Sequence, residues 1–498
     1  MTALTDTLRE KVSSVPCGDF TPLLLIPLLL ILTILYHRTR NAHVPRYPDP
    51  FGLMFIYGAK KAADRKDVPF WFASLFDRYG ETFVIPSILG KTSYATMAPE
   101  NIKTFLSTSF NSWALGKLRE QAFEPLLGKG IFTQDGGEWS HSRKLLRPQF
   151  QRRELEGLGS IHEHIGKMVE LIPDGEVVDM QPLVYRLTLD TATEFLFGET
   201  AGSLDSTDKA TNGQGFADAF NTAQSYIVWR FRVGKILNTL FHSSEGEDAI
   251  RRCHSYVDQY IFRNTQKPLS QSGRYVFLDS LKSEETDPFK LRCQSLHVLL
   301  AGRDTTAGTL GWTFMLLAQH PQVWKKLKLA CEVLPKEPGF SELKDIPYLR
   351  HVIAEVLRLY PSVPSNGRVA TQDTILPHPA PGIKVKKGEF VRYSPMAMQR
   401  RKDIWGEDAD EFRPERWEEE GLMQRVGSWG YLPFNGGPRV CLGQQFALME
   451  ASAVVQAVVR SFEGVEYCGG EMHVVEPALT MAPAASVVRF WGKREVEK

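Results

Sequence analysis

The stretch that decides the fold is FNGGPRVCLG, which runs from Phe434 to Gly443. Three glycines and a proline surround its one cysteine, Cys441, and the amphipathic run from Gln445 to Val459 follows almost at once. Glycine and proline at this density predict a shaped loop, and the periodic apolar residues after it predict a helix. Backbone N–H groups and the dipole at a helix N-terminus stabilise a thiolate, the form of cysteine that binds a metal. The stretch allows two interpretations of Cys441, an axial metal ligand or a buried structural cysteine.

The spacing around Cys441 is restrictive. An aromatic residue stands seven positions before it, a glycine four before, an arginine two before and a glycine two after. In this pattern the chain resembles the cytochrome P450 haem-thiolate monooxygenases. The resemblance implies haem b as the cofactor, with Cys441 as the thiolate ligand of its iron. It also implies that Phe434 packs beside the sulfur, that Arg439 pairs with a haem propionate, and that Gly437 and Gly443 belong to the cofactor-binding loop.

A second motif, AGRDTT, spans Ala301 to Thr306 and lies midway between Pro288 and Pro321 in a long apolar stretch that predicts a helix. Its glycine and threonines lower helix propensity, so a local widening of the hydrogen-bond ladder is physically easy there, and such a gap can hold water. A glycine-rich helix crossing with a capping aspartate is the plain alternative. The resemblance implies that Asp304 and Thr305 are the acid and alcohol pair that delivers protons during oxygen activation.

Glu355 and Arg358 stand three residues apart in a predicted helix from Tyr348 to Tyr360. Alone, such a pair is an ordinary surface ion pair worth about a few tenths of a kcal/mol. The resemblance adds Arg416 as a third partner and implies a buried network that supports the cofactor loop. It also implies three further cofactor-binding residues, which donate to the propionates: Trp139, Arg143 and Arg368.

Composition limits the other possibilities. Hydrophobic residues make up 43% of the 498, and 59 basic side chains almost balance 58 acidic ones, which argues against a disordered chain and a nucleic-acid binder. Six scattered cysteines form no C-x-x-C pair, so a disulfide framework is not expected and a reducing cytosolic setting fits. No repeat is present and one loop-like region, 201–215, stands out, so we predict a single catalytic domain. Its class is mainly α with small β-sheets, as in the cytochrome P450 fold, and residues 383–391 predict a hairpin around a Lys-Gly turn.

The N-terminus contains an uncharged apolar run from Phe20 to Tyr36. With about 17 residues it reaches the lower limit for a transmembrane helix, and the arginines after it place the body on the cytosolic side. We therefore predict a lumenal segment at 1–19, one transmembrane anchor at 20–36, a proline-rich hinge at 37–52 and a haem-binding monooxygenase domain at 53–498. A cleaved signal peptide is the alternative. The expected location is the endoplasmic reticulum membrane, with a single pass and a cytosolic catalytic domain.

Within the family, the chain resembles most the fungal n-alkane and fatty-acid terminal hydroxylases, through the segments 125–133, 186–199 and 441–447. The resemblance implies hydroxylation of an apolar C–H bond, of a long-chain fatty acid or an n-alkane. Two departures leave the substrate open: the connection from Leu376 to Val385 is short, and Gln399 replaces a usual histidine. Ala301 stands where some animal fatty-acid hydroxylases carry a glutamate that esterifies haem, so no such covalent bond is expected.

Oxidative tailoring in a fungal secondary-metabolite pathway is therefore an alternative function. Two weaker alternatives are a haem-thiolate isomerase or dehydratase, which needs no reductase, and a non-catalytic haem sensor. The presence of Asp304 and Thr305 argues against both.

No G-x-G-x-x-G fingerprint is present, so the electrons must come from a partner. The resemblance implies NADPH-cytochrome P450 reductase, docking near the cysteine-loop face, with cytochrome b5 as a further candidate. The other expected partners are the membrane and an apolar small molecule. No nucleic-acid partner is expected. The substrate pocket is expected at 113–132, 299–306, 362–366 and 479–484, with Lys117 or Arg119 as the partner of a substrate carboxylate.

Overall fold

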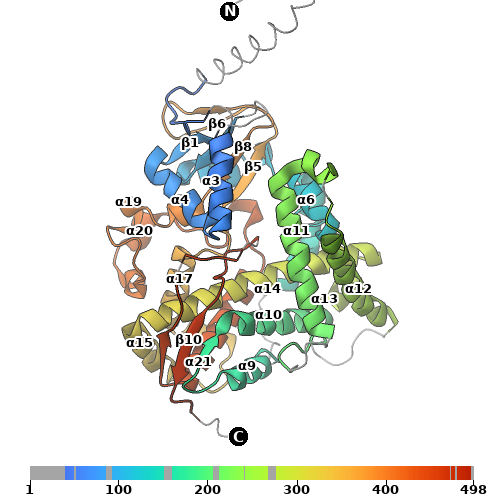
Figure 1. Ribbon diagram of the computed structural model, residues 1–498, viewed down its shortest axis with the longest axis vertical. Helices are drawn as coiled ribbons and strands as arrows, with labels where there is room; N and C mark the ends of the chain where they lie inside the picture. The colour runs from blue at the N-terminus through green and yellow to red at the C-terminus, as the bar shows by residue number, and fades with distance from the viewer. Residues whose placement is uncertain are drawn as a thin grey trace, which may run out of the picture.

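The computed structural model describes residues 40–49, 52–85, 92–150, 160–205, 212–240, 242–266, 276–471, 473–476 and 479–494. Helices dominate this part of the chain and the sheets are small, which confirms the predicted class (Figure 1). The predicted lumenal segment and the anchor at 20–36 lie outside the described residues. Among the helices that the structure describes, none combines the length and the apolar character needed to cross a bilayer.

The longer helices form most of the body. They are α3 (Leu53–Asp64), α4 (Val68–Tyr79), α6 (Lys117–Leu127), α7 (Gly136–Leu146), α9 (Ser160–Leu171), α10 (Met180–Phe197), α11 (Asn212–Leu240), α12 (Ser244–Gln266), α14 (Pro288–Gln319), α15 (Pro321–Cys331), α17 (Pro347–Leu359) and α21 (Gln444–Ser461). The shorter ones are α5 (Pro99–Lys103), α13 (Phe277–Lys282), α16 (Phe340–Lys344), α18 (Pro395–Met398), α19 (Lys402–Trp405) and α20 (Leu422–Val426). Tighter or wider turns lie at Thr104–Thr108, Phe110–Ser112, Arg147–Phe150, Pro414–Glu418 and Gly437–Arg439.

Helix α14 runs through the middle of the molecule, with α10 beside it (Figure 1). Its start follows from local sequence, because the Asp287 side chain accepts a hydrogen bond from the Phe289 N–H and Pro288 occupies the first turn. It ends before Pro321, as the sequence predicts. Apolar residues surround the helix on most sides, so it packs against α10, α12, α17 and α21 and forms the centre of the main core.

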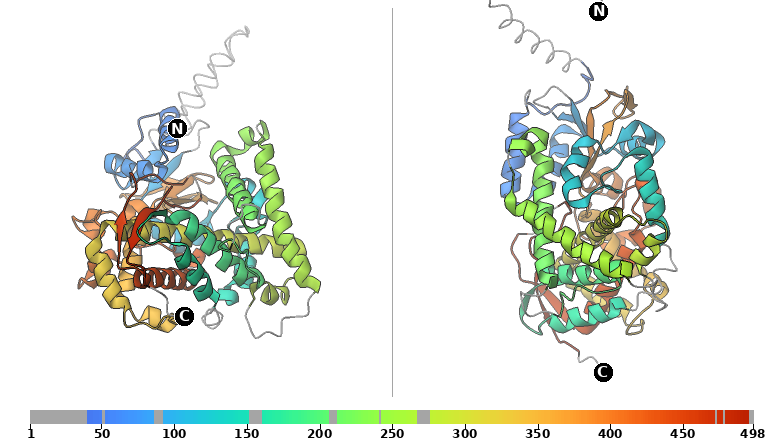
Figure 2. Two further views of the ribbon diagram at one scale, coloured as in Figure 1. Left: turned by 60° about the horizontal axis from the view of Figure 1, so that its bottom comes forward. Right: turned by 90° about the vertical axis from the view of Figure 1, so that its right-hand side faces the viewer.

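The strands form three sheets. They are β1 (Thr82–Ile85), β2 (Ser93–Thr96), β3 (Trp113–Ala114), β4 (Val177–Asp179), β5 (Asn366–Ala370), β6 (Thr374–Leu376), β7 (Ile383–Val385), β8 (Phe390–Tyr393), β9 (Gly464–Tyr467) and β10 (Val487–Trp491). The largest sheet has the order β1-β2-β8-β5-β3, and β4-β10-β9 and β6-β7 form the other two. Figures 1 and 2 show the largest sheet on one side of α14, with α3 and α4 beside it and α11 across from them.

The predicted hairpin at 383–391 is wrong. A turn does form, because the Glu389 N–H donates to the Lys386 carbonyl at 3.0 Å. The strands on its two sides then separate: β7 pairs with β6, whereas β8 pairs with β2 and β5. Both edges of β8 are therefore occupied, and alternation within the sequence alone does not show which strand will be the partner.

The described part of the proline-rich hinge lies against β1. The Tyr47 N–H donates to the Val84 carbonyl at 3.0 Å, and the Val84 N–H donates to the Pro45 carbonyl at 2.8 Å. Arg40 forms an ion pair with Glu389, which lies in the turn just before β8. Residues 40–49 are thus attached to the body by backbone bonds and an ion pair.

Candidate functional site

The Cys441 loop has the shape that its glycines predict. The Cys441 N–H donates to the Phe434 carbonyl and the Val440 N–H donates to the Gly437 carbonyl, both at 3.0 Å. Gly437 has a φ of +66°, and a Cβ placed there would lie 1.9 Å from the Leu106 carbonyl oxygen. No other residue fits this position, because it requires both a left-handed backbone and the absence of a side chain. The loop leads directly into α21, so the predicted arrangement of a loop opening a helix is confirmed.

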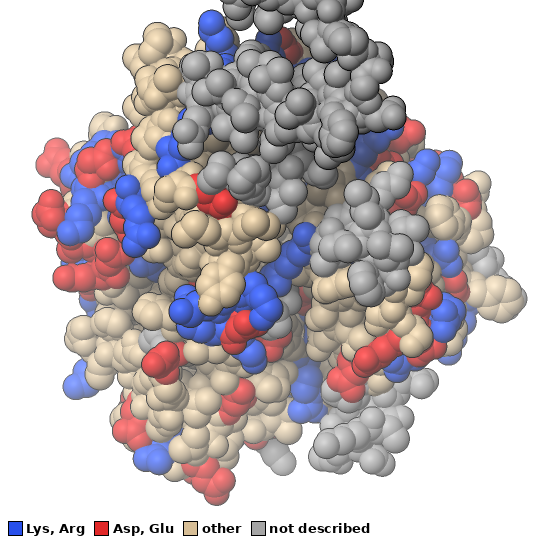
Figure 3. Space-filling view, turned by 45° about the horizontal axis from the view of Figure 1, so that its top comes forward, with Lys and Arg blue, Asp and Glu red and all other residues tan. Residues whose placement is uncertain are grey.

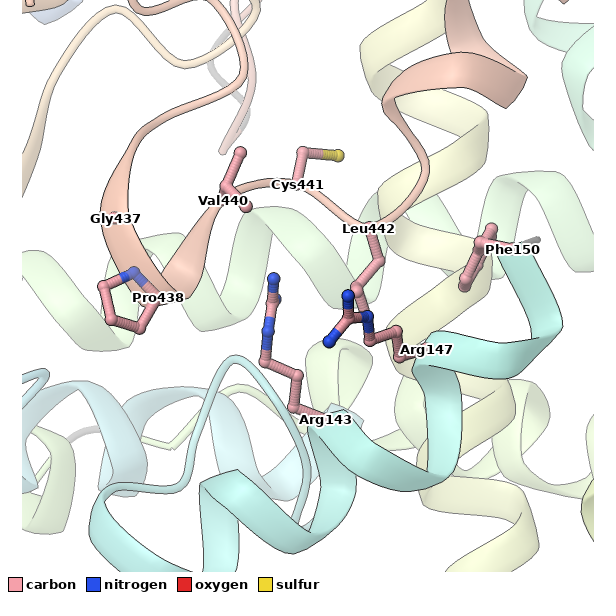
Figure 4. Close-up of a pocket in the computed structure, with 8 residues that line it drawn as sticks. All are labelled: Arg143, Arg147, Phe150, Gly437, Pro438, Val440, Cys441 and Leu442. Carbon is pink, nitrogen blue, oxygen red and sulfur yellow. The ribbon is translucent and has the colours of Figure 1, made fainter. Parts of the chain in front are cut away.

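The Cys441 side chain opens into a cleft of about 560 Å³ (Figure 4). Arg143 and Arg147 point into this cleft from the end of α7, and Phe150 lies beside them. Protein surrounds most of the thiol and raises its pKa, while the Gly443 N–H and the nearby Arg143 cation act in the opposite direction. A structural core cysteine would be sealed, so this position favours the metal-ligand interpretation.

Arg439 and Trp139 meet beside the loop. The Arg439 guanidinium lies 4.3 Å from the centre of the Trp139 ring and donates to Asp135 Oδ1 at 2.8 Å and to the Ile131 carbonyl at 3.3 Å. Burial, and then the neighbouring Arg368, lower the pKa of Arg439 to about 9. The structure therefore brings the predicted residues Trp139 and Arg439 together.

Two more arginines complete an arginine cluster, which we define as Arg119, Arg143, Arg368 and Arg439. Arg368 is 2% exposed on β5, and its Nε has no hydrogen-bond partner within the described residues. Arg119 on α6 donates to Asn366 Oδ1 and to the Phe132 carbonyl, both at 3.1 Å, while burial and Arg368 lower its pKa to about 10. In the part of the chain that the structure describes, Asp135 is the one carboxylate that forms an ion pair with the cluster. The cluster thus holds excess positive charge that an anion would neutralise.

Asp304 and Thr305 lie on different sides of α14. The Thr305 hydroxyl donates to the Ala301 carbonyl at 2.6 Å, on a side where a Cβ on Gly302 would meet nothing within 4 Å. Asp304 is 3% exposed and pairs with Arg303 at 2.8 Å instead of with Thr305. The structure therefore places the predicted acid and alcohol next to each other along the chain without a hydrogen bond between them.

The widening that the sequence makes easy does not occur in α14, which is a continuous helix from Pro288 to Gln319. The threonine hydroxyls bond to carbonyls four residues earlier, which leaves the backbone ladder intact. Two of its glycines serve close packing: a Cβ on Gly308 would lie 2.9 Å from the Met481 carbonyl, and one on Gly311 1.9 Å from Gln181. The plain alternative, a glycine-rich helix crossing, is thus correct for Gly311, which packs against α10, whereas Gly308 packs against the non-helical segment at Met481 and Gly302 borders open space.

An apolar strip, which has Phe132 and Val363 at its ends and Ala301 between them, borders Thr305. His297, Ala301 and Thr305 follow one face of α14 at a spacing of four residues. Phe132 reaches the first of them, since its N–H donates to His297 Nδ1 at 3.3 Å and the two rings lie 5.4 Å apart. At the other end, the Ser362 hydroxyl donates to the Thr305 carbonyl at 3.3 Å, and Val363 follows it with 37% of its surface exposed. These contacts join the segment 362–366 to the segment 299–306 and place Phe132 of the segment 113–132 against the preceding turn of the same helix, at His297.

The remainder of the predicted pocket wall is less uniform. Leu126 and Leu127 are fully buried in the main core, so they pack the protein and do not line an open space. Leu118 is 46% exposed, and Lys117 is exposed as well. Part of the apolar residues in the segment 113–132 therefore pack the core and do not form a pocket wall.

The network of Glu355, Arg358 and Arg416, called the Glu355 network below, is fully buried, with each side chain 0% exposed. Arg358 donates through Nε and Nη2 to the two oxygens of Glu355, at 2.8 and 2.7 Å, and Arg416 donates from Nε at 3.3 Å. Trp417 and the backbone N–H of Arg413 donate to the same carboxylate at 3.1 Å. The surface-pair interpretation is excluded, and all three residues meet as the resemblance implies.

Gln399, the residue that replaces a usual histidine, belongs to this network and lies outside the apolar strip. Its Nε2 donates to the Leu357 and Arg358 carbonyls at 3.1 and 2.9 Å, and its Oε1 accepts from the Leu432 N–H at 2.8 Å. Leu432 comes shortly before Phe434, so Gln399 connects the end of α17 to the Cys441 loop. This departure from the family pattern therefore concerns support of the loop.

Sequence reasoning missed three residues here. Asp135 carried no signal, because its partner Arg439 is far away in sequence, and Arg119 was considered for a substrate carboxylate but not for the arginine cluster. Glu450 lies within the predicted helix that follows Cys441 and is 1% exposed, with the Thr191 hydroxyl donating to its Oε1. Burial raises the pKa of Glu450 to about 7. A charged residue on the otherwise apolar side of α21 was the one available signal.

An open thiol at a shaped loop, faced by an excess of buried arginine, defines a haem-thiolate type of site. The family model for Cytochrome P450 matches residues 45–483. A Cytochrome P450 of Arthroderma benhamiae is 41% identical over 440 residues, which cover 84% of this chain and 83% of that protein. Cytochrome P450 52A12 of Debaryomyces hansenii is 41% identical over 83% of this chain and 84% of its own, and Cytochrome P450 monooxygenase g430 of a Fusarium species is 39% identical over 84% and 78%.

The chain therefore belongs to the cytochrome P450 family and is a haem-dependent monooxygenase that takes electrons from a redox partner and acts on an apolar substrate. The residues present fit haem b. Its iron requires a thiolate, and its two propionates require cations, which the accessible Cys441 and the under-neutralised arginine cluster offer. The unpartnered Nε of Arg368 is a donor still available to such an anion.

Proposed function

We propose that Cys441 is the axial ligand of haem iron and that Trp139, Arg143, Arg368 and Arg439 bind and orient the cofactor through its propionates. Haem, when bound, supplies the activation of dioxygen and the transfer of one oxygen atom to carbon. The observation that carries this assignment is the thiol at the cleft together with the cationic excess of the arginine cluster. Phe434, Gly437 and Gly443 fix the backbone that presents the thiol.

Thr305 and Asp304 have separate tasks in this proposal. The Thr305 hydroxyl faces the apolar strip and is placed to hold a proton at its Oγ1. Asp304, one residue earlier and buried, is the acid that resupplies it. Thr305→Ala should keep haem binding and lower the amount of product formed per NADPH, with hydrogen peroxide as the measured by-product. An unchanged ratio of product to NADPH would argue against the relay.

The substrate we propose is a long-chain fatty acid or an n-alkane. The strip beside Thr305 offers carbon side chains at both ends, Phe132 and Val363, and small ones between them. A linear chain gains about 0.8 kcal/mol per buried methylene, so it can bind firmly with few polar contacts. Among the residues expected to meet a carboxylate, Lys117 is the exposed one, whereas Arg119 is already bound to Asn366 and Phe132.

A titration of the purified holoenzyme with fatty acids and alkanes of increasing length tests this proposal. The spin-state shift of the haem spectrum should strengthen with chain length. Lys117→Ala should weaken the binding of acids more than of matched alkanes, while the exposed Lys129 serves as the control for the loss of a surface cation. A response to cyclic compounds and to no linear lipid would replace this substrate class with the secondary-metabolite alternative.

That alternative gains no support from the short connection noted in the sequence. The connection between β6 and β7 holds His378, whose carbonyl accepts from Asn101 Nδ2 at 2.7 Å and whose N–H donates to the same side chain. It lies with β6 at the top of the view in Figure 1, whereas α14 crosses the middle. The isomerase and sensor alternatives are tested by NADPH consumption, which neither requires.

We also propose that NADPH-cytochrome P450 reductase docks over the cleft at Cys441, where Arg143 and Arg147 provide positive charge. Cytochrome b5 is a second candidate for this face. On the face shown in Figure 3, basic and acidic side chains are interspersed, in keeping with the near-zero net charge. Charge reversal at Arg147 should lower the rate of reduction and leave the spectrum of the bound haem unchanged.

The location we propose is the endoplasmic reticulum membrane, through the anchor at 20–36. Helix α3 supports this, because it follows the N-terminal region and exposes four large apolar side chains: Leu53, Met54, Ile56 and Tyr57. Deletion of residues 1–36 should shift the protein from the membrane fraction towards the soluble one. An unaltered distribution with full activity would exclude the anchor.

A further inference from the structure

Two arginines from distant parts of the chain lie near each other between α11 and the largest sheet. Arg392 comes from β8 and Arg232 from α11, and Figures 1 and 2 show α11 across from the lobe that holds this sheet. Burial, and then the charge of Arg232, lower the pKa of the Arg392 guanidinium, so the two charges act on each other. These two residues are called the arginine pair below.

The register of the sheet places Arg392 on the face that points away from the arginine cluster. In the pairing of β5 with β8, Arg368 stands opposite Val391 and Gly367 stands opposite Arg392. Residues directly opposite each other share a face, whereas successive residues of a strand point to opposite faces. Arg368 and Arg392 therefore lie on opposite sides of the sheet, and the haem propionates do not account for Arg392.

Apolar groups hold Arg392 in place. Its guanidinium carbon lies 5.1 Å from the ring centre of Phe72 on α4, and Ala95 of β2 is its neighbour in the sheet. Phe390, two residues earlier on the same face of β8, covers Gly367, where a Cβ would lie 2.1 Å from the ring. A ring against one face of a guanidinium leaves the N–H groups at its edge for another partner.

That partner is missing from the protein itself. Within the described residues, neither side chain of the arginine pair forms a hydrogen bond or an ion pair. Burial is the first cause that lowers the pKa of each, and no carboxylate of the described chain raises either value. Two like charges in partly desolvated surroundings cost free energy, which an anion between them recovers. Arg232 is exposed, so an anion from solution can reach the pair.

Two elements lead from the centre of α14 to the arginine pair, and both give a similar length. Helix α11 rises about 12 Å over the eight residues from Gln224, whose amide acts on α14, to Arg232. The chain from Val363, at one end of the apolar strip, to Gly367, the neighbour of Arg392, spans at most about 14 Å. An extended chain advances about 1.2 Å per bond, so roughly ten to twelve bonds cover this distance.

We propose that the arginine pair binds the carboxylate of a fatty-acid substrate and thereby places the far part of its chain beside Thr305. This inference rests on the substrate class proposed above and names the residues that select acids. Guanidinium N–H groups match the oxygens of a carboxylate, and two cations on one carboxylate fix its direction as well as its charge.

Lys117 has a smaller part in this arrangement. The preceding residue, Gly116, lies against Val369, since a Cβ there would be 2.7 Å from the valine side chain. Val369 shares the sheet face of Arg392, so Lys117 borders the same region. Its ammonium is exposed and strongly hydrated, and an exposed ion pair contributes little. Arg392→Gln should therefore weaken the binding of acids more than Lys117→Ala does.

Titrations of the holoenzyme with hexadecanoic acid and with hexadecane test the inference. Arg392→Gln and Arg232→Gln should each raise the Kd of the acid by about tenfold or more, the value of a charged hydrogen bond. The Kd of hexadecane should stay within about twofold, and Lys129→Gln is the control for the loss of a surface cation. Equal weakening of acid and alkane, or an unchanged Kd of the acid, would overturn the proposal.

The double variant asks whether both arginines bind the same carboxylate. Its loss of acid binding should be smaller than the product of the two single losses, because groups that share one partner are not additive. Losses that multiply would overturn the shared site.

The position of the new hydroxyl is a readout that a general loss of folding would not move. The wild type should hydroxylate hexadecanoic acid within a narrow range of carbons far from the carboxylate. Arg392→Gln should spread the hydroxyl over more carbons of the acid and leave the products of hexadecane unchanged. The same product pattern in both enzymes would overturn the positioning role of the pair.

The phosphate of a membrane lipid carries the same sign of charge. If it is the ligand, Arg392→Gln should weaken binding to vesicles of phosphatidic acid and leave the Kd of hexadecanoic acid unchanged, which would overturn the proposal. If the wild type neither binds nor oxidises hexadecanoic acid and hexadecane, the substrate class fails and this inference fails with it. If it oxidises both and Arg392→Gln affects neither, the substrate class stands and the carboxylate site alone is refuted.

Discussion

The Glu355 network and the arginine cluster are two buried groups of charge in one protein, and they differ in completeness. In the Glu355 network one carboxylate accepts from two arginines, a tryptophan and a backbone N–H, and its arginines also donate to carbonyls. In the arginine cluster four cations share one paired carboxylate, and burial lowers the pKa of three of them, Arg119, Arg143 and Arg439. The first group is satisfied by the chain itself, whereas the second requires an anion from outside.

The difference teaches how to tell a structural charge from a binding one. A structural group ends its hydrogen bonds on the protein and loses little when a ligand leaves. A binding group keeps unneutralised charge and an unused donor, here Arg368 Nε. The prediction that follows is that the Glu355 network governs folding and the cluster governs cofactor retention.

The largest effect is expected at the thiol. Cys441→Ala should abolish the carbon-monoxide difference spectrum of thiolate-ligated haem, because the cleft offers no other sulfur ligand within the described residues. Cys468→Ala, at the other partly accessible cysteine, is the matched control and should keep the spectrum. A normal spectrum in Cys441→Ala would refute the ligand assignment.

Glu355→Ala should be the most destabilising single change. It leaves Arg358 buried without a carboxylate and Arg416 with Asp408 as its remaining one, at a cost of roughly 3 to 5 kcal/mol in the free energy of unfolding. Lys326→Ala, which removes an exposed ion pair with Glu415 nearby, should cost less than about 1 kcal/mol. Denaturant unfolding of both apoproteins measures the contrast, and equal costs would mean that the two pairs are equivalent.

Glu450 is a third kind of buried charge. Within the described residues, no buried cation donates a hydrogen bond to this buried acid. Burial raises its pKa to about 7 from an ordinary value of 4.5, so folding favours the protonated form. The contribution of protonated Glu450 to the free energy of unfolding is complete below pH 4.5 and is lost as the pH rises through about 7. The free energy of unfolding changes by up to roughly 3 kcal/mol over this range. Glu450→Gln should remove this part of the pH dependence, as followed by unfolding between about pH 4.5 and 8. A variant with the same pH profile as the wild type would exclude the assignment.

The smallest effect, and the one that sharpens the comparison most, is expected at Arg368. Arg368→Gln should leave the folded apoprotein at least as stable as the wild type, because it relieves repulsion with Arg119 and Arg439. The same change should weaken haem retention by about tenfold or more, the value of a charged hydrogen bond. Haem transfer to an acceptor protein measures retention, with Arg392→Gln on β8 as the control. A loss of apoprotein stability without loss of haem would reverse the comparison.

Much of the fold and of the site was predictable from sequence. The helix predicted from Tyr348 to Tyr360 and found at Pro347–Leu359, the helix of AGRDTT and the loop at Cys441 follow from local patterns, and each lies where the pattern predicts to within a residue or so. The hairpin at 383–391 failed because β8 finds partners from distant parts of the chain. The predicted wall of the pocket was only partly correct, because Leu126 packs in the core whereas Phe132 borders the apolar strip. A single sequence does not distinguish an apolar residue of the core from one that lines a pocket.

The sequence by itself predicted which residues carry the chemistry, because the constraints on the Cys441 loop, on Glu355 with Arg358 and on Asp304 with Thr305 act over a few neighbouring positions. The tertiary structure alone decided which partners those residues take. It paired Arg439 with Asp135, placed Arg119 in the arginine cluster and turned Asp304 toward Arg303 and away from Thr305. The physical reason is that the energy of a buried charge depends on every group within a few ångströms, and packing over long sequence separations brings those groups together.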